Sequence, residues 1–202
     1  MRNSNKLVRG IGVRGTLYPT KAHGKTLKEY LLWSSMLSRC SSTYKATRAT
    51  YIDATCSENF KYYSYFYEWC NKQVGFGNVD EGGHCWQLDK DILARENKTY
   101  SEDTCCFVPQ RVNKLVIKRD AARGEHPIGV HWSNFLSVFL AKCNVGNGKT
   151  KYIGRFNTPQ EAFLAYKTFK EALIKEVANE YKEMLDSRVY EALMNYEVNE
   201  ND

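Results

Sequence analysis

Two oxygen-bearing side chains, Asp89 and Asn113, stand close to apolar segments in the middle of the sequence. Asp89 follows the short apolar run at residues 86–88, and Asn113 comes shortly after a second run at residues 105–108. Carboxylate and amide oxygens are hard ligands that suit a divalent ion such as Mg2+ or Mn2+, which keeps water positions open for a phosphate. The pair would therefore suit a divalent ion that must stay open to a phosphate.

Both side chains would have to be positioned by a strand, a loop, a second strand and a helix. The two apolar runs have the length of short strands, and the polar segment between them, residues 94–103, contains the turn-forming Asn97 and has no hydrophobic period. Pro109 follows the second run, and its fixed φ suits the first turn of a helix. In such a unit Asp89, at the end of the first strand, and Asn113, one turn into the helix, can approach one another.

This order of elements resembles the ββα-metal motif of HNH nucleases, particularly the phage homing-endonuclease type. The closest likeness is FVPQRVN at residues 107–113, which is similar to the last part of that motif. The resemblance implies a divalent-metal-dependent DNA endonuclease or nickase, in which Asp89 and Asn113 hold one Mg2+ or Mn2+ ion.

The sequence departs from the motif at two positions. Lys90 stands where the motif has the histidine that acts as general base, and Thr104 stands where it has its middle asparagine. A lysine with an ordinary pKa is protonated near pH 7 and cannot accept a proton. Three alternatives stay open: the pKa of Lys90 is strongly lowered, another group is the base, or the site is inactive.

We favour a metal-bound water as the substitute for the base, because the ion raises the acidity of that water. Lys90 would then act as a clamp on the phosphate. Asp91 and His84 are further candidates for the base. The alternative without chemistry is a charged strand end with a capped helix behind it.

The composition is that of a globular protein in a reducing compartment. The chain has 202 residues, enough for one large or two small domains, and no apolar run approaches the roughly 20 residues that span a bilayer. Its seven cysteines form no C-x-x-C pair, so we expect buried free thiols. A structural zinc site drawn from Cys40, Cys56, Cys70 and Cys85 stays open. The expected location is the cytoplasm, that of the host cell if a phage encodes the protein.

Positive charge is concentrated before residue 171. The formal net charge is +6, and from Glu171 onward nine acidic residues face three basic ones, so the earlier part carries most of the positive charge. This distribution favours a polyanion such as DNA as the partner. Residues 1–25 hold six basic residues and no acid. We interpret them as a flexible basic arm that lies along phosphates; a tail kept for solubility is the alternative.

Two helices are predicted as a scaffold for the metal unit. Thr26 and Glu29 have the spacing of a capping box, so the first helix should begin there and run to about Arg39. Its predicted buried residues are Leu27, Tyr30, Leu31 and Met36 or Leu37. A second helix is predicted over residues 57–71, where aromatic residues recur at helical spacing. Such aromatics are more typical of a core than of stacking platforms for bases.

A sheet and a long helix are predicted after a linker at residues 123–127. Three apolar runs at residues 128–132, 135–144 and 151–156 indicate three strands joined by turns. Thr158 and Glu161 form a second capping box, and the apolar stripe of the helix that follows can cover one face of the sheet. A last amphipathic and acidic helix, from residue 186 to residue 198, should pack back on the protein or on a second copy.

The stretch from the first strand to the long helix resembles the plant ethylene-response-factor, or apetala-type, DNA-binding domain, which also occurs beside HNH motifs in phage proteins. The likeness rests on GVHW at residues 129–132, YIGRF at 152–156 and TPQEAFLAY at 158–166. In that family the sheet lies in the major groove of DNA.

The apetala-type resemblance implies DNA contacts from His131, Trp132, Lys142, Lys151 and Arg155. Even without the family, the cations Lys142, Lys149, Lys151 and Arg155 would charge the uncovered face of the sheet. His131 replaces the family's usual arginine, so a base preference cannot be transferred, because arginine's bidentate contact with guanine is lost.

Together these patterns predict an α+β protein: a helical scaffold with an HNH-like ββα-metal motif, then a three-stranded antiparallel sheet packed on a long helix. The predicted parts are a basic arm (1–25), a nuclease domain (26–120), an apetala-type DNA-binding domain (121–185) and an acidic C-terminal helix (186–202). The expected function is cleavage or nicking of double-stranded DNA with Mg2+ or Mn2+. The rival is a catalytically degenerate DNA-binding protein, or a phage-encoded inhibitor of a host factor.

Overall fold

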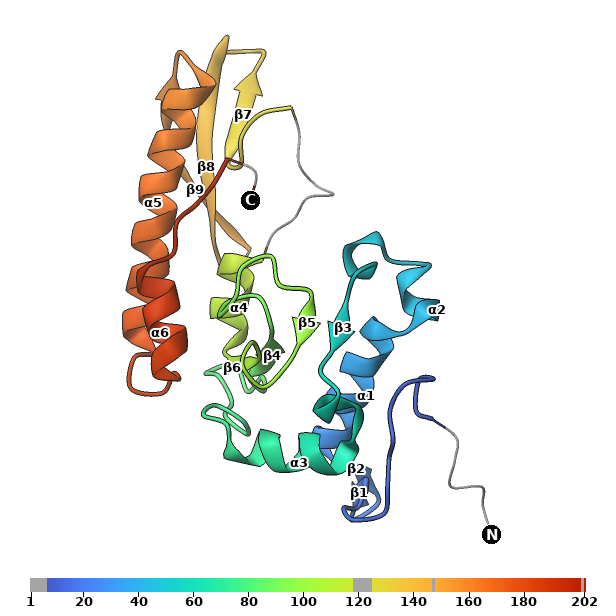
Figure 1. Ribbon diagram of the computed structural model, residues 1–202. Coiled ribbons are helices and arrows are strands. Elements are labelled where there is room, and N and C mark those ends of the chain that lie inside the picture. Colours follow the sequence, from blue (N-terminus) through green and yellow to red (C-terminus); the bar gives the residue numbers. More distant parts are fainter. Residues whose placement is uncertain (1–6, 118–124, 147, 201) are drawn as a thin grey trace. The chain divides into compact units, whose positions relative to one another are not determined.

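The computed structural model describes residues 7–117, 125–146, 148–200 and 202, and the chain forms two compact units (Figure 1). The first unit extends to Val108 and the second begins at Pro109, whereas the sequence placed the boundary near residue 120. Residues 123 and 124 of the predicted linker lie outside the described residues. The fold is mixed, with 37% helix and 22% strand. No helix in the described part of the chain is long and apolar enough to cross a membrane.

The first unit is built from short helices and strands. In chain order they are β1 (Lys21–Ala22), β2 (Lys25–Thr26), α1 (Lys28–Cys40), α2 (Ser42–Lys45), the 3₁₀ turn η1 (Ala49–Tyr51), β3 (Thr55–Cys56), the 3₁₀ turn η2 (Asn59–Lys61), α3 (Tyr63–Lys72), β4 (Gln87–Asp89), β5 (Thr99–Tyr100) and β6 (Cys106–Val108). β1 pairs with β2 and β4 with β6, both antiparallel, and β3 pairs with β5 in parallel.

The first helix, α1, begins at Lys28 without the predicted cap. Thr26 pairs with Lys21 in the β1–β2 hairpin, so it belongs to a strand, and Leu27 becomes the N-cap with no side-chain hydrogen bond. The predicted capping box of Thr26 and Glu29 is therefore wrong. The predicted end of the helix near Arg39 is confirmed, since α1 ends at Cys40.

Aromatic side chains form the core of the first unit. Trp33 of α1 is fully buried with Phe60, Tyr63 and Phe66, and its indole Nε1 donates a hydrogen bond to the backbone oxygen of Phe60 at 2.8 Å. The aromatic residues predicted over 57–71 are thus core residues, as expected. Leu31, predicted to be buried, is 57% exposed because it lies on the opposite side of α1 from Trp33.

The segment before α1 is held on the first unit as far as the structure describes it. The backbone N–H of Val13 donates to the oxygen of Lys61 at 2.8 Å, and the Val13 oxygen accepts from the N–H of Tyr63 at 3.0 Å. Residues 7–25 therefore differ from the predicted flexible arm. The same pairing leaves Tyr62 extended, so the single helix predicted over 57–71 is divided into η2 and α3.

The strand, loop, strand and helix predicted around Asp89 are present. β4 and β6 pair with Asp89 opposite Cys106, and Pro109 is the N-cap of α4 (Gln110–Val116), which follows at once. The loop between the strands also contains β5, which the sequence did not predict. A strand of two residues has no period that could reveal it.

The second unit contains a three-stranded antiparallel sheet covered by a long helix, as predicted (Figure 1). After α4 its described elements are β7 (Val130–Ser133), β8 (Val138–Gly146), β9 (Lys149–Phe156), α5 (Pro159–Glu180) and α6 (Ser187–Met194). The capping box before α5 is confirmed: the Glu161 N–H donates to the Thr158 hydroxyl, and the Glu161 carboxylate accepts from the Thr158 N–H, each at 3.2 Å.

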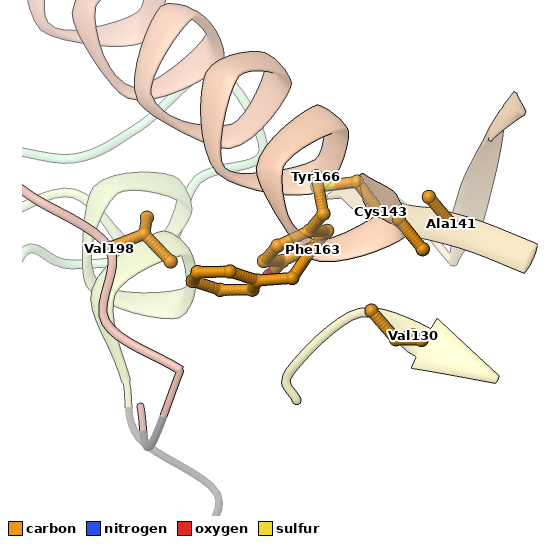
Figure 2. Close-up of a cluster of buried hydrophobic side chains, with 7 residues drawn as sticks. Val130, Ala141, Cys143, Phe163, Tyr166 and Val198 are labelled. Carbon is orange, nitrogen blue, oxygen red and sulfur yellow. The ribbon is translucent and has the colours of Figure 1, made fainter. Parts of the chain in front are cut away.

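The core of the second unit lies between α5 and the sheet. Figure 2 shows Phe163 and Tyr166 of α5 beside strand residues Val130, Ala141 and Cys143. The approach is so close that only glycine fits at position 129. A Cβ atom on Gly129 would lie 2.1 Å from the Tyr166 ring, and its φ of +78° is strained for any residue with a side chain.

The C-terminal segment completes this core. The predicted last helix is present as α6, which packs on α5 but ends at Met194 and not near residue 198. Val198 lies beyond the helix and joins the buried cluster (Figure 2). The N–H of Val198 donates to the Glu171 carboxylate, and its oxygen accepts from the Lys167 ammonium, both at 2.8 Å. Two side chains of α5 thus hold the backbone of Val198 in place.

Candidate metal site and nucleic-acid interface

Asp89 ends β4, and its carboxylate organises the turn that follows. Its Oδ1 accepts hydrogen bonds from the backbone N–H groups of Asp91 at 2.8 Å and Ile92 at 2.9 Å. Burial raises the pKa of Asp89, and the two backbone hydrogen bonds oppose that rise. A carboxylate withdrawn from water at a cost in stability is more frequent at functional sites than elsewhere.

Lys90 is buried, and its side chain ties the following loop to β4. The ammonium donates to the backbone oxygen of Asn97 at 2.8 Å, pairs with the Asp91 carboxylate and lies 5.7 Å from the centre of the Tyr100 ring. Asn97 in turn donates to the backbone oxygens of Lys90 at 3.0 Å and Thr99 at 2.6 Å. Lys90 thus has a structural use within the loop, and its contact with a phosphate stays a prediction.

The other residues at or near the expected catalytic positions lie in local turns. The His84 backbone N–H donates to the Asp80 carboxylate at 2.9 Å, and the His84 ring Nδ1 lies 3.2 Å from the same carboxylate oxygen. The contacts with the His84 backbone and ring lower the pKa of Asp80. The Thr104 hydroxyl donates to the Thr99 oxygen at 2.8 Å and accepts from the Ser101 N–H at 3.1 Å. Thr104 therefore closes a turn at the position where the HNH motif has its middle asparagine.

Asn113 lies in α4 and is 9% exposed. Asn113 belongs to the second unit and Asp89 belongs to the first. That both side chains bind one metal ion therefore stays a prediction. Both carry the oxygen donors that Mg2+ or Mn2+ takes. Among the described residues, no group of three or more His, Cys, Asp or Glu side chains is placed to hold a metal ion.

The four cysteines considered for zinc differ in their surroundings. Cys40 and Cys70 are buried, Cys56 is half-buried and Cys85 is exposed, and all seven cysteines of the chain are free thiols.

The sheet of the second unit has one face against α5 and one face that α5 does not cover. Side chains alternate between the two faces along each strand. Because Val130 and Ala141 belong to the core cluster, their neighbours His131 and Lys142 lie on the other face.

The register of β9 extends the uncovered face. Arg155 lies opposite Leu140 and Tyr152 lies opposite Lys142. The Arg155 Nε donates to the Tyr152 hydroxyl at 3.2 Å, which places both side chains on the same side of the sheet. We call this set of side chains the open face: His131, Leu140, Lys142, Tyr152 and Arg155.

The remaining predicted contact residues lie elsewhere. Trp132 packs on Phe139, with the ring centroids 4.8 Å apart, on the side of the sheet that faces α5. Lys151 is paired with Cys143, which also faces α5, and Lys149 is paired with Gly146 at the end of the β8–β9 hairpin. Alternation along β7 alone separates Trp132 from His131. For Lys151 the face follows only from the register, because a bulge shifts the pairing of β9 with β8.

His131 contributes hydrogen-bonding capacity more than charge to the open face. Burial lowers its pKa, and the nearby charges of Lys142 and His126 lower it further. The ring is therefore mainly neutral near pH 7.

Sequence reasoning missed two members of the open face and one exposed side chain in the turn between β7 and β8. Leu140 could have been found from the alternation along β8. Tyr152 could not, because a bulge between Ala141 and Lys142 shifts the pairing with β9. Phe135, in the turn between β7 and β8, is 94% exposed.

Comparison with known proteins finds no family model, no curated protein and no solved structure that matches the chain.

Proposed function

We propose that the protein binds double-stranded DNA through the open face. The observation that carries this proposal is the pairing of Lys142 with Tyr152 and of Leu140 with Arg155 on a sheet face that α5 does not cover. Guanidinium, ammonium, phenol and imidazole groups on one face can contact phosphates and base edges together.

The charge of the strands supports an anionic partner. Residues 128–156 contain four basic residues and no acidic one, whereas the chain from Glu171 onward is acidic. The acidic residues thus follow the sheet in the sequence and leave the strands themselves with an unopposed positive charge. This distribution favours the approach of a phosphate backbone to the sheet.

Fluorescence anisotropy with a labelled duplex of about two helical turns tests the proposal. Lys142→Gln and Arg155→Gln should each weaken binding by about three- to tenfold, as expected for the loss of a phosphate or base contact. Lys175→Gln removes the same charge from an exposed position on α5 and serves as the matched control. If all three variants bind alike, the open face is not the binding surface.

Metal-dependent cleavage of that DNA is the second candidate function. The observation that favours it is the desolvated carboxylate of Asp89 at the end of β4, within the order β4, β6 and α4 that the HNH resemblance requires. Asp89 and Asn113 would hold the ion, and the ion would supply Lewis acidity at the scissile phosphate. Lys90 would hold its loop in place beside Asp89.

Conversion of supercoiled plasmid to nicked or linear DNA tests this second function. The wild type should cut with Mg2+ or Mn2+ and not with EDTA, and Asp89→Ala should abolish cutting. Binding in EDTA without cutting under any condition would leave the protein a DNA-binding protein. If Asp89→Ala keeps its fold but loses both DNA binding and DNA cleavage, the idea that Asp89 acts only in cleavage is wrong.

A further inference from the structure

The first unit has an open groove along one side of α1, with a volume of about 370 Å³. We call it the α1 groove: it is lined by one face of residues 30–39 of α1, by Arg9 and by Tyr44. Small-ligand sites in proteins have volumes of about 300 to 1,000 Å³. The groove is therefore large enough for one small ligand, such as a single nucleotide.

The groove exists because short side chains stand where long ones would fill the space. Ser38 lies one turn beyond the neighbouring Ser34 and Ser35, and all three line the groove beside the buried Trp33. Arg9 reaches one of them, with its Nε 3.4 Å from the Ser34 hydroxyl. The lining thus includes three serine hydroxyl groups, which can donate to an anion.

Two guanidinium groups line the groove without a carboxylate partner. None of the ion pairs formed by the described residues involves Arg9 or Arg39, and the described lining contains no acidic side chain. Arg39 donates one hydrogen bond, from Nη1 to the Tyr100 hydroxyl at 3.2 Å, and lies 6.0 Å from the centre of the Tyr51 ring.

A half-buried guanidinium with neutral neighbours is suited to an incoming anion. It has five N–H donors in a planar fork that matches the oxygens of a phosphate or carboxylate. Arg39 uses one of these donors on the Tyr100 hydroxyl and lies over the Tyr51 ring. Both neighbours can orient the guanidinium, and neither carries a negative charge. The positive charge therefore remains available to a ligand in the groove.

We propose that the α1 groove binds a phosphate group carried by a nucleotide or by a nucleic-acid strand. Arg9 and Arg39 neutralise the phosphate, and the three serine hydroxyls donate hydrogen bonds to its oxygens. Tyr44, whose ring is held edge-on by Tyr51 at 5.5 Å, borders the space next to the phosphate. An aromatic base attached to that phosphate would meet this ring.

This inference is independent of the proposed function. The groove lies in the first unit and the open face in the second, and each has its own variants. A failure of Lys142→Gln and Arg155→Gln to weaken duplex binding would overturn the proposed function and leave the groove untouched. In the same way, a failure of the groove variants described next to weaken phosphate binding would overturn the groove proposal and leave the proposed function untouched.

Calorimetric titration of the full chain tests the groove with four probes. They are inorganic phosphate, deoxyadenosine monophosphate, a short single strand with a 5′-phosphate and the same strand with a 5′-hydroxyl. Ser35→Glu places a negative charge at the groove, and Arg39→Gln removes a positive one. Each should weaken binding of the phosphate probes by about tenfold or more, the loss typical of a charge-assisted hydrogen bond.

Two variants of the first unit provide matched charge controls. Val74→Glu adds the same negative charge at an exposed position, and Lys72→Gln removes a positive charge from the exposed end of α3. Both should bind the probes as the wild type does. Ser35 is exposed and makes no buried contact, so Ser35→Glu tests the groove even if Arg39→Gln fails to fold.

The probes also distinguish the source of the phosphate. Preference for the monophosphate and the 5′-phosphorylated strand identifies a nucleotide or a strand end as the ligand. Equal binding of the 5′-hydroxyl strand identifies an internal phosphodiester. If no probe binds at a concentration on the order of 10 mM, or if the groove variants and the controls bind alike, the proposal is wrong.

Discussion

Asp89 is half-buried, and the partial loss of water around its carboxylate has a consequence for stability. The pKa of Asp89 is raised above its ordinary value of 3.8, with burial as the main cause. The folded state therefore holds the proton more tightly than the unfolded state does. Stability falls as pH rises from 3.8 through the pKa of the folded state, and above that pKa the charged form lowers stability by a constant amount.

Asp89→Asn should therefore stabilise the protein at neutral pH, while it replaces the carboxylate that we propose as a metal ligand with an amide. The amide oxygen can still accept from Asp91 and Ile92, and the buried charge is gone. We expect a gain on the order of 1 kcal/mol at pH 7 that disappears below the ordinary pKa of an aspartate. Urea unfolding across this range measures it, and a variant less stable than the wild type at pH 7 would contradict the assignment.

Lys90 is expected to matter for folding whatever its role toward a phosphate. Lys90→Met keeps a long unbranched side chain and removes the donor to the Asn97 oxygen. The free energy of unfolding of the first unit should therefore fall by about 1–3 kcal/mol. Lys98→Met, an exposed lysine of the same loop, should change stability by no more than about 0.5 kcal/mol. Thermal unfolding of both variants checks the difference, and equal values would argue against the anchoring role.

Individual residues show where sequence reasoning ends. Asp89, Lys90 and Asn113 could be singled out from residue type and order. The contact between Lys90 and Asn97 could not, because the loop that joins them folds back without a periodic signal. The α1 groove could have been suspected from serines at helical spacing, but Arg9 reaches it only through the fold.

At the scale of single elements, the turn between β7 and β8 presents Phe135 to solvent. An apolar side chain beside a DNA-binding face can insert at a base step. Phe135→Ala should weaken duplex binding by about fivefold and change the unfolding temperature little, because an exposed side chain contributes little to stability. Leu164→Ala, also exposed but on α5, is the control and should bind normally. Equal affinities of the two variants would exclude the insertion.

The approach of α5 to the sheet depends on Gly129. Gly129→Ala should destabilise the second unit by roughly 2–5 kcal/mol, because the new methyl group meets the Tyr166 ring and the backbone is strained. Gly148→Ala separates the two effects: its φ is +71°, but no atom lies within 4 Å of a Cβ built there. We expect Gly148→Ala to lower the free energy of unfolding by about 1 kcal/mol, measured by chemical denaturation. Similar losses in both variants would contradict the close contact.

Elements with a strong local signal were predicted and those fixed by distant contacts were not. The capping box of Thr158 and the three strands before it follow from local chemistry, and both are present. The capping box of Thr26 has the same pattern but lies in a hairpin, so the competing strand pairing prevails. His131 and Trp132 were predicted to contact DNA together, but they are neighbours on β7, so their side chains point to opposite faces of the sheet.

At the scale of the whole molecule, the chain is basic before residue 171 and acidic after it. Phosphate contacts made by the basic part should make DNA binding depend on salt concentration. The logarithm of the affinity should fall linearly with the logarithm of salt concentration, by about 0.9 for each phosphate neutralised. Removing Lys142 and Arg155 together should reduce that slope by about 2, while Lys175→Gln should leave it unchanged. Anisotropy titrations at several salt concentrations measure the slopes, and parallel lines for all proteins would rule out phosphate contacts by these residues.

The position of Val198 in the core of the second unit bears on how the protein is made. Val198 lies against side chains that precede it by tens of residues, and Lys167 and Glu171 hold its backbone. During synthesis this core cannot close until the ribosome has released residue 198. The sheet and α5 therefore keep one apolar face incompletely covered until the segment after α6 has been synthesised.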